Sequence, residues 1–196
     1  MFVNFFQIFI SILILRTIEG IRQNITGGSF IKNKYSYSPV ILAFDNVGPL
    51  MCIKNCLLHK GCKAVNFNGS QFECELLNVT FPYDMLTDIK GSFYTEIDGW
   101  TKDKDGCTPN PCEVGQRCVP AMYNNYICLK IDLPCDVNLC QHKYGVCRNK
   151  VNGYRCICQD GYYGDYCEHT PCTDVICNSG SNCYINGSDG ICMQQS

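Results

Sequence analysis

Eighteen cysteines in 196 residues constrain the fold of this chain more than any other feature of its sequence. Free thiols at this density would be a liability in a reducing compartment, so the pattern indicates disulfides formed along the export route. The number is even, which allows every cysteine to be paired. None precedes Cys52, and none lies between Cys74 and Cys107. We therefore expect several small units that need cross-links, because each is too short to fold on a hydrophobic core alone.

Residues 1–20 have the features of a signal peptide. Residues 2–15 are apolar apart from three polar positions, and the small Gly20 suits cleavage. The run is too short to cross a bilayer comfortably. The usual basic residues before it are missing, so an uncleaved anchor is the alternative. No other long apolar run and no hydrophobic C-terminal tail follow, and we expect a secreted protein without stable membrane insertion after signal removal.

Four glycosylation sequons fit the same secretory route. They begin at Asn24, Asn68, Asn78 and Asn186, which we predict as N-glycosylation sites. The net charge is only -2, and no basic patch or long acidic run stands out. Nucleic-acid binding and bulk capture of calcium or mineral are therefore not expected.

The first cysteine group lies where the apolar period changes from helical to extended. Residues 48–61 read as one helix, with Pro49 in its first turn and Gly61 as its C-terminal cap. Positive charge near its end, at Lys54, His59 and Lys60, would suit the helix dipole. Cys52 and Cys56 are four residues apart, so they lie on one side of this helix.

Alternating segments follow the helix and predict strands. Residues 62–68 and 71–77 alternate apolar and polar side chains around a turn at Asn68 and Gly69, which predicts a hairpin. Residues 91–97 supply a further strand. The sequence therefore predicts a helix lying across an antiparallel sheet.

This arrangement over residues 22–98 resembles the PAN/apple family. The resemblance rests on the two helix cysteines, on the strand that begins at Cys62 and on the strand Cys74-Glu-Leu-Leu. It implies nested bridges, Cys52–Cys74 and Cys56–Cys62. No cysteine precedes Cys52, so the likeness is to the four-cysteine form. Members of this family bind proteins or carbohydrates and are not enzymes, and the resemblance does not specify which ligand is bound.

A zinc site is the alternative for this cysteine group. His59 is close in sequence to Cys52 and Cys56, and these residue types bind zinc. Export favours oxidised sulfur over thiolate, however, so we expect bridges at these positions.

One cysteine spacing recurs three times after residues 99–106, a polar and charged segment that reads as a linker. The three groups are Cys107, Cys112, Cys118 and Cys128; Cys135, Cys140, Cys147 and Cys156; and Cys172, Cys177, Cys183 and Cys192. Only the middle group continues, with Cys158 and then Cys167. Lys130 and Gln194 stand where the fifth cysteine of the other two groups would be.

The tail of the middle group, a C-x-C followed by C-x2-G-[FY]-x-G-x2-C, resembles the EGF-like module. The pairing of that family implies the bridges Cys135–Cys147, Cys140–Cys156 and Cys158–Cys167. In the truncated repeats it implies Cys107–Cys118, Cys112–Cys128, Cys172–Cys183 and Cys177–Cys192. The predicted boundaries are 107–130 for a truncated repeat, 131–168 for the complete module and 171–196 for a second truncated repeat.

The middle module carries its own turn and packing signals. Asn152 and Gly153 suit a hairpin turn, and Gly161 and Gly164 allow the bends that return Cys167 to Cys158. Tyr154 and Tyr162 are predicted to pack on each other as a miniature core. The alternative is that these rings are exposed and bind a ligand.

Calcium is the cofactor that the EGF-like resemblance raises. Asn149 fits the second half of the calcium-binding pattern, and Asp132 lies three residues before Cys135. Pro134 stands where a further acidic or amide ligand would be. One carboxylate and one amide are too few for an ion that takes six to eight oxygens, so calcium binding here would be weak.

The sequence disfavours two other classes of function, growth factors and enzymes. The four-residue loop at 136–139 is shorter than in EGF-type growth factors, and Glu168 follows Cys167 where such ligands soon carry a leucine. The histidines His59, His142 and His169 belong to no catalytic motif, so we do not expect an enzyme.

The fold class expected is a small disulfide-rich multidomain protein. A PAN/apple-like α+β module, with a helix on an antiparallel sheet, precedes tandem β-hairpin EGF-like modules. We predict a secreted binding or adhesion protein that recognises an extracellular protein or glycan through the PAN-like unit. The EGF-like modules would act as a spacer or docking surface. An EGF-type signalling ligand or receptor modulator is the alternative.

Overall fold

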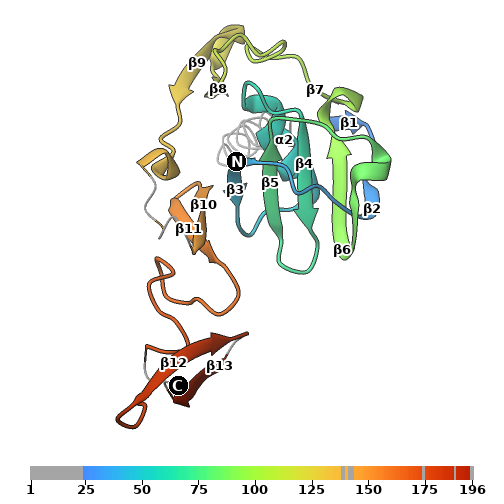
Figure 1. The fold of residues 1–196 in the computed structure, drawn as a ribbon. Coiled ribbons are helices and arrows are strands. Elements are labelled where there is room, and N and C mark those ends of the chain that lie inside the picture. The colour runs from blue at the N-terminus through green and yellow to red at the C-terminus, as the bar shows by residue number, and fades with distance from the viewer. Residues whose placement is uncertain (1–23, 138–139, 141–143, 174, 188, 195–196) are drawn as a thin grey trace, which may run out of the picture.

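The computed structural model describes residues 24–137, 140, 144–173, 175–187 and 189–194 (Figure 1). The predicted signal peptide and His142 lie outside the described residues. Within the described residues, no helix is long and apolar enough to cross a bilayer. The strands are β1 Ile25–Gly27, β2 Ile31–Tyr35, β3 Val40–Phe44, β4 Ala64–Asn68, β5 Glu73–Leu77, β6 Thr87–Glu96, β7 Trp100–Lys102, β8 Gln116–Pro120, β9 Tyr126–Lys130, β10 Gly145–Lys150, β11 Gly153–Cys158, β12 Ser181–Asn186 and β13 Asp189–Gln194.

Helix α2, Pro49–Leu58, lies against a mostly antiparallel sheet, as the sequence predicted. The described residues also form the 3-10 turns η1 Tyr83–Met85, η2 Ile97–Gly99, η3 Met122–Asn124 and η4 Pro134–Val137. The strand order of the large sheet is β11-β10-β3-β5-β4-β6-β2. The predicted hairpin is present, because β4 and β5 pair antiparallel from Ala64↔Leu77 to Asn68↔Glu73.

The end of the helix differs from the prediction. Helix α2 ends at Leu58, and the C-cap His59 is extended (φ -96°, ψ 110°), so Gly61 is not the cap. The reason is a competing backbone pairing: the Lys60 N–H donates to the Gln116 carbonyl over 2.9 Å instead of continuing the helix. No basic side chain lies in the last turn, so the expected dipole contribution of His59 and Lys60 is also wrong.

The main core lies between α2 and one face of the sheet. Ile53 from the helix packs with Val65 of β4 and Leu76 of β5, and all three are fully buried. The bridges Cys52–Cys74 and Cys56–Cys62 tie the helix to the chain that forms these strands. Burial of apolar side chains and the two cross-links therefore act on the same interface.

The segment 99–106 is not a simple linker, which corrects the prediction. Strand β7 pairs antiparallel with β1, and Trp100 packs into the main core. The indole Nε1 of Trp100 donates to Thr95 Oγ1 over 3.0 Å. A tryptophan gains more from this burial than from exposure in a linker, so the chain remains part of the domain until Lys102.

All eighteen cysteines lie among the described residues, and none is free. The structure pairs Cys52–Cys74, Cys56–Cys62, Cys107–Cys118, Cys112–Cys128, Cys135–Cys147, Cys140–Cys156, Cys158–Cys167, Cys172–Cys183 and Cys177–Cys192. Each bridge therefore lies within one of the units expected from the cysteine spacing.

Each unit after the helix-and-sheet domain is built on one antiparallel hairpin: β8–β9, β10–β11 and β12–β13. The turn of the middle hairpin differs by one residue from the prediction. Lys150 pairs with Gly153, so the turn is formed by Val151 and Asn152, and Gly153 (φ 139°) begins β11. Only glycine adopts this backbone conformation readily.

The hairpins do not form an independent string. Strand β10 joins the large sheet by pairing in parallel with β3 at Lys150↔Ala43, and the Val151 N–H donates to the Ala43 carbonyl over 3.2 Å. The β8–β9 unit contacts the end of α2 through an antiparallel bridge between His59 and Arg117. The β12–β13 hairpin lies at the opposite end of the molecule from α2 (Figure 1).

Candidate functional site

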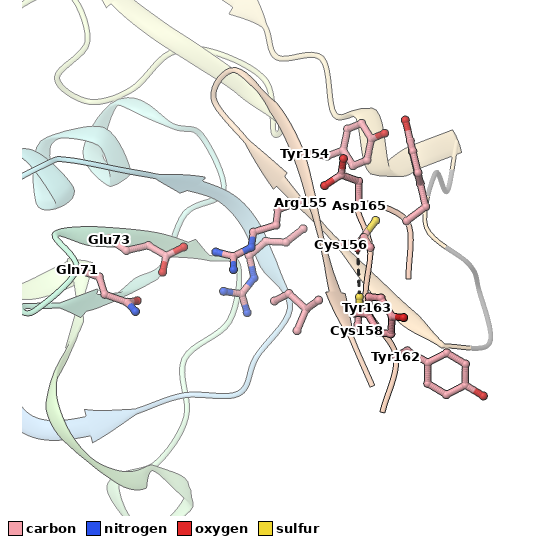
Figure 2. A pocket seen from close by; sticks show the side chains of 13 residues that line it. Gln71, Glu73, Tyr154, Arg155, Cys156, Cys158, Tyr162, Tyr163 and Asp165 are labelled. Carbon is pink, nitrogen blue, oxygen red and sulfur yellow. Dashed lines mark hydrogen bonds between the residues drawn. The ribbon is translucent and has the colours of Figure 1, made fainter. Parts of the chain in front are cut away.

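A groove of about 840 Å³ lies at the junction between the β4–β5 hairpin and the β10–β11 hairpin. We call it the junction groove. It is lined by Gln71, Glu73, Arg148, Tyr154, Arg155, Cys156, Ile157, Cys158, Tyr162, Tyr163, Gly164, Asp165 and Tyr166. Figure 2 shows Gln71 and Glu73 across from Arg155, with Tyr154, Asp165 and Tyr162 beyond strand β11. Residues from two parts of the chain therefore contribute to one hollow.

Strand alternation explains this division of the groove. Successive side chains of a strand point to opposite faces. Arg155 thus faces the β4–β5 hairpin, whereas its neighbours Tyr154 and Cys156 face the tail of the same module (Figure 2). Strand β11 has β10 as its one neighbour in the sheet order, so it forms the edge along which the groove runs.

Buried Glu75 organises the polar contacts beside the groove. Its side chain accepts a hydrogen bond from Tyr35 over 2.9 Å and from Asn66 Nδ2 over 3.0 Å, and it forms an ion pair with Arg148. Glu75 is only 4% exposed, so its charge needs these partners. Burial, together with the Glu75 carboxylate, raises the pKa of Tyr35 far above its usual value and keeps it a hydrogen-bond donor.

A second ion pair fixes the same hairpin against the sheet. Lys150 Nζ lies 2.7 Å from a carboxylate oxygen of Asp45 and 3.6 Å from one of Glu73. Together with the Arg148–Glu75 pair, these contacts join the middle module to the helix-and-sheet domain. The relative positions of the two groove walls are therefore set by charge pairs as well as by the β10–β3 contact.

A smaller hollow of about 210 Å³ continues from the junction groove and shares Glu73 and Arg148 with it. Its other lining residues include Asn66, Asn68 and Ser92. Asn66 pairs with Glu75 in the β4–β5 register, one position from the Val65 and Leu76 pair of the main core. Alternation therefore places this polar surface on the face of the sheet opposite α2.

Arg155 and its cross-strand neighbour Arg148 differ in their ion pairing. Arg148 and Arg155 are directly opposite in the β10–β11 register, where like charges are unfavourable. Arg148 is neutralised by Glu75, whereas Arg155 is exposed and forms no ion pair among the described residues. Its guanidinium can therefore donate to a bound ligand, beside the acceptors Gln71 and Glu73.

The predicted packing of Tyr154 on Tyr162 is wrong. Tyr162 stacks on Tyr144, with ring centroids 4.0 Å apart and an interplanar angle of 11°, and Tyr154 lies against Tyr166 with centroids 6.3 Å apart. The backbone explains the exchange, because the Gln159 N–H donates to the Tyr144 carbonyl and the Tyr162 N–H donates to the Gln159 carbonyl. Both predicted rings nevertheless line the junction groove.

The calcium candidates are not assembled into a metal cluster. The Oδ1 of Asn149, which is buried, accepts a hydrogen bond from the Cys135 N–H over 2.8 Å, and Asp132 is exposed. Among the described residues, no group of three or more His, Cys, Asp or Glu side chains is placed to hold a metal ion. Asn149 thus has a structural contact of its own in this arrangement.

The other predicted site residues are dispersed. Asn24, Asn78 and Asn186 are exposed, whereas Asn68 is half-buried and its Oδ1 accepts hydrogen bonds from Ser70 and Gln71 in the hairpin loop. Their glycosylation stays a prediction. Cys52 and Cys56 are both in disulfides, which leaves no thiolate for the zinc site considered above.

Comparison with known proteins identifies the first domain. Residues 29–97 match the family model of the PAN domain. The chain is 40% identical over 75 residues to Protein lin-12 of Caenorhabditis elegans, covering 36% of this chain and 5% of that protein. It is 29% identical over 96 residues to Protein glp-1 of the same organism, and this match covers 41% of this chain and 7% of that protein.

A third similarity is to the Cubilin homolog of Caenorhabditis elegans, with 28% identity over 81 residues, or 33% of this chain and 2% of that protein. The chain thus spans only a small part of each of these relatives. A PAN domain lies at residues 29–97, and the disulfide-rich units after it are EGF-like, as the matches to the EGF-repeat proteins lin-12 and glp-1 indicate. Modules of both kinds serve extracellular binding or signalling.

Proposed function

We propose that this chain, a PAN domain followed by EGF-like modules, is a secreted binding or adhesion protein that holds a protein or carbohydrate ligand in the junction groove. The observation that carries the proposal is Arg155, which has no ion pair in the described part of the chain and faces Gln71 and Glu73 across a hollow formed by two domains. A secreted location is supported by the disulfides, which persist in oxidising compartments.

The chemistry of the groove supports a polar, hydroxyl-bearing or amide-bearing ligand. Arg155 supplies donors, and the carboxylates of Glu73 and Asp165 supply acceptors. The rings of Tyr154 and Tyr162 add flat apolar surface beside these groups. Sites that bind small ligands commonly combine aromatic surface with a few polar groups that fix orientation.

The fixed walls of the groove support affinity. Disulfides and the ion pairs of Arg148 and Lys150 hold both hairpins before any ligand arrives. Pre-organised surfaces lose less conformational entropy on binding than mobile ones. The third module, β12–β13, is then available as a spacer or a second docking surface.

The first experiment is a glycan array and a pull-down from extracellular extract with the full secreted chain. Once a ligand is found, Arg155→Ala should weaken binding by about tenfold or more, because a hydrogen bond from a charged group contributes roughly 1.5–3 kcal/mol. Lys104→Ala is the control, since Lys104 is exposed and does not line the groove. Equal affinities of wild type, Arg155→Ala and Tyr154→Ala would overturn the proposal.

A receptor-modulating or signalling role is the alternative. The similarity to lin-12 and glp-1, which covers more than a third of this chain, supports this alternative role. A phosphorylation assay on cells treated with the full chain distinguishes the two: a dose-dependent response favours the signalling role, and binding without a response favours adhesion.

A further inference from the structure

The end of helix α2 is built into the first EGF-like module. Leu58, the last helical residue, packs with Cys107, Cys112 and Cys118, and these four residues are all buried. The Asn110 side-chain amide donates to the carbonyl of Leu58 over 2.9 Å and to that of Leu57 over 3.3 Å. The His59 N–H caps the carbonyls of Asn55 and Cys56, and the module caps the last two carbonyls of the helix.

Backbone contacts extend this interface past the helix. The Lys60 N–H donates to the Gln116 carbonyl over 2.9 Å, and the Gly115 N–H donates to the Lys60 carbonyl over 3.0 Å. Arg117 donates to Asn55 Oδ1 over 3.1 Å, and Lys60 Nζ donates to the Asn110 carbonyl over 2.9 Å. The PAN domain and the first module thus meet through hydrogen bonds on both sides of His59.

His59 lies in the middle of this interface and is only 4% exposed. Its Nε2 is buried without a hydrogen-bond partner among the described residues. Buried polar atoms of this kind are uncommon and call for an explanation. Burying an unpaired imidazole costs less free energy when the ring is neutral than when it is charged. The site therefore favours the neutral form of His59.

The charges around His59 reinforce this preference. Arg117 approaches from β8 and Lys60 from the chain after the helix, and both are cations. The hollow beside the imidazole has a volume of about 210 Å³. Besides His59 and Lys60, its lining residues are Cys56, Leu57, Gly61, Cys62, Ile97 and Asn110, and none of them is a carboxylate. From η2 this lining receives only Ile97. Burial and then Arg117 lower the pKa of His59 below its ordinary value of 6.5.

We propose that His59 is a pH-dependent latch that holds the first EGF-like module against the PAN domain at neutral pH and loosens this contact in acidic compartments. Protonation takes a proton from solvent and places a second cation beside Arg117, with no acid in the hollow to balance it. The contribution of the neutral ring to the interface is complete above the ordinary histidine pKa. It falls as the pH drops through that value and through the lower pKa of the folded protein.

The test is amide hydrogen exchange of the full secreted chain at about pH 7.5 and about pH 5, the range over which histidine changes charge. Each rate is corrected for the intrinsic effect of pH. We expect the protection of residues 107–118 to fall about tenfold at the acidic pH, because a buried cation without a counter-ion destabilises the contact that encloses it. His59→Gln should remove this pH dependence.

His169→Gln is the control, because His169 is partly exposed and lies just after the middle module, away from this interface. It should keep the pH response of the wild type. Equal protection at the two pH values, or the same loss in His59→Gln as in wild type, would overturn the latch. If His59→Gln is not secreted, an NMR titration of wild-type His59 decides instead: a midpoint below 6.5 that moves the amide signals of residues 107–118 supports the proposal, and an ordinary midpoint contradicts it.

Discussion

Glu75 and Arg148 are the pair on which the contact between the PAN domain and the middle module most depends. Their charges meet across 73 residues of sequence, and the Glu75 side chain is 5% exposed. Breaking such a pair from one side leaves a buried charge without its counter-ion, which costs more than the pair contributes when intact. Loss of this one ion pair should therefore weaken the contact between the two domains as well as the local packing.

We therefore expect Arg148→Met to lower the free energy of unfolding by about 3 kcal/mol, measured by chemical denaturation with the disulfides intact. Arg155→Met is a matched control, since Arg155 lies opposite Arg148 on the same hairpin and forms no ion pair among the described residues. It should change stability by no more than about 0.5 kcal/mol. Similar losses in both variants would show that the buried pair has no special role.

Single-residue roles could be predicted from the sequence only in part. The cysteine spacing, with the family resemblances, led to the nine pairs that the structure brings together. The ring packing of Tyr154 and Tyr162 was mistaken, because stacking depends on which backbone turn brings two rings together, and spacing alone does not reveal it. The Asn149 contact with the Cys135 amide likewise has no local signal.

At the scale of elements, alternation and turn residues were enough to predict the β4–β5 hairpin and a strand that overlaps β6. The short strands β1 and β7 were missed, and part of their segment was taken for a linker. Each has three residues, and they pair across about seventy-five positions, so neither carries a period of its own. The helix end was misplaced for a similar reason, because the competing partner lies in the next module.

The β1–β7 contact gives an element-scale prediction. A Cβ at Gly28 would lie 2.3 Å from the Trp100 indole, so Gly28→Ala must displace the ring that closes the core. We expect a lower melting temperature and altered tryptophan fluorescence, which, excited selectively, reports on Trp100 alone because the chain has one tryptophan. Gly91→Ala controls for backbone strain: Gly91 also has positive φ but nothing within 4 Å. An effect of Gly28→Ala no larger than that of Gly91→Ala would contradict the proposed packing.

At the scale of the whole molecule, the order of modules could be predicted, but their association could not. Arg148 and Lys150 look in the sequence like ordinary surface charges, as do Asp45 and Glu73. Only the fold shows that Arg148 meets Glu75, that Lys150 meets Asp45 and Glu73, and that the junction groove forms beside these pairs. Apart from the alternative role of Tyr154 and Tyr162 as ligand-binding rings, the candidate site was missed for the same reason: its walls come from segments that are more than seventy residues apart.

The β10–β3 pairing and the ion pairs of Arg148 and Lys150 join the PAN domain to the middle EGF-like module at the junction groove, so we expect the two to move as one rigid body. Residual dipolar couplings from a weakly aligned sample of the full secreted chain test it directly. A single alignment tensor should fit the couplings of residues 29–97 and of residues 144–167. Two different tensors would mean that the modules move independently, and a groove built from both walls would then not exist as a binding site.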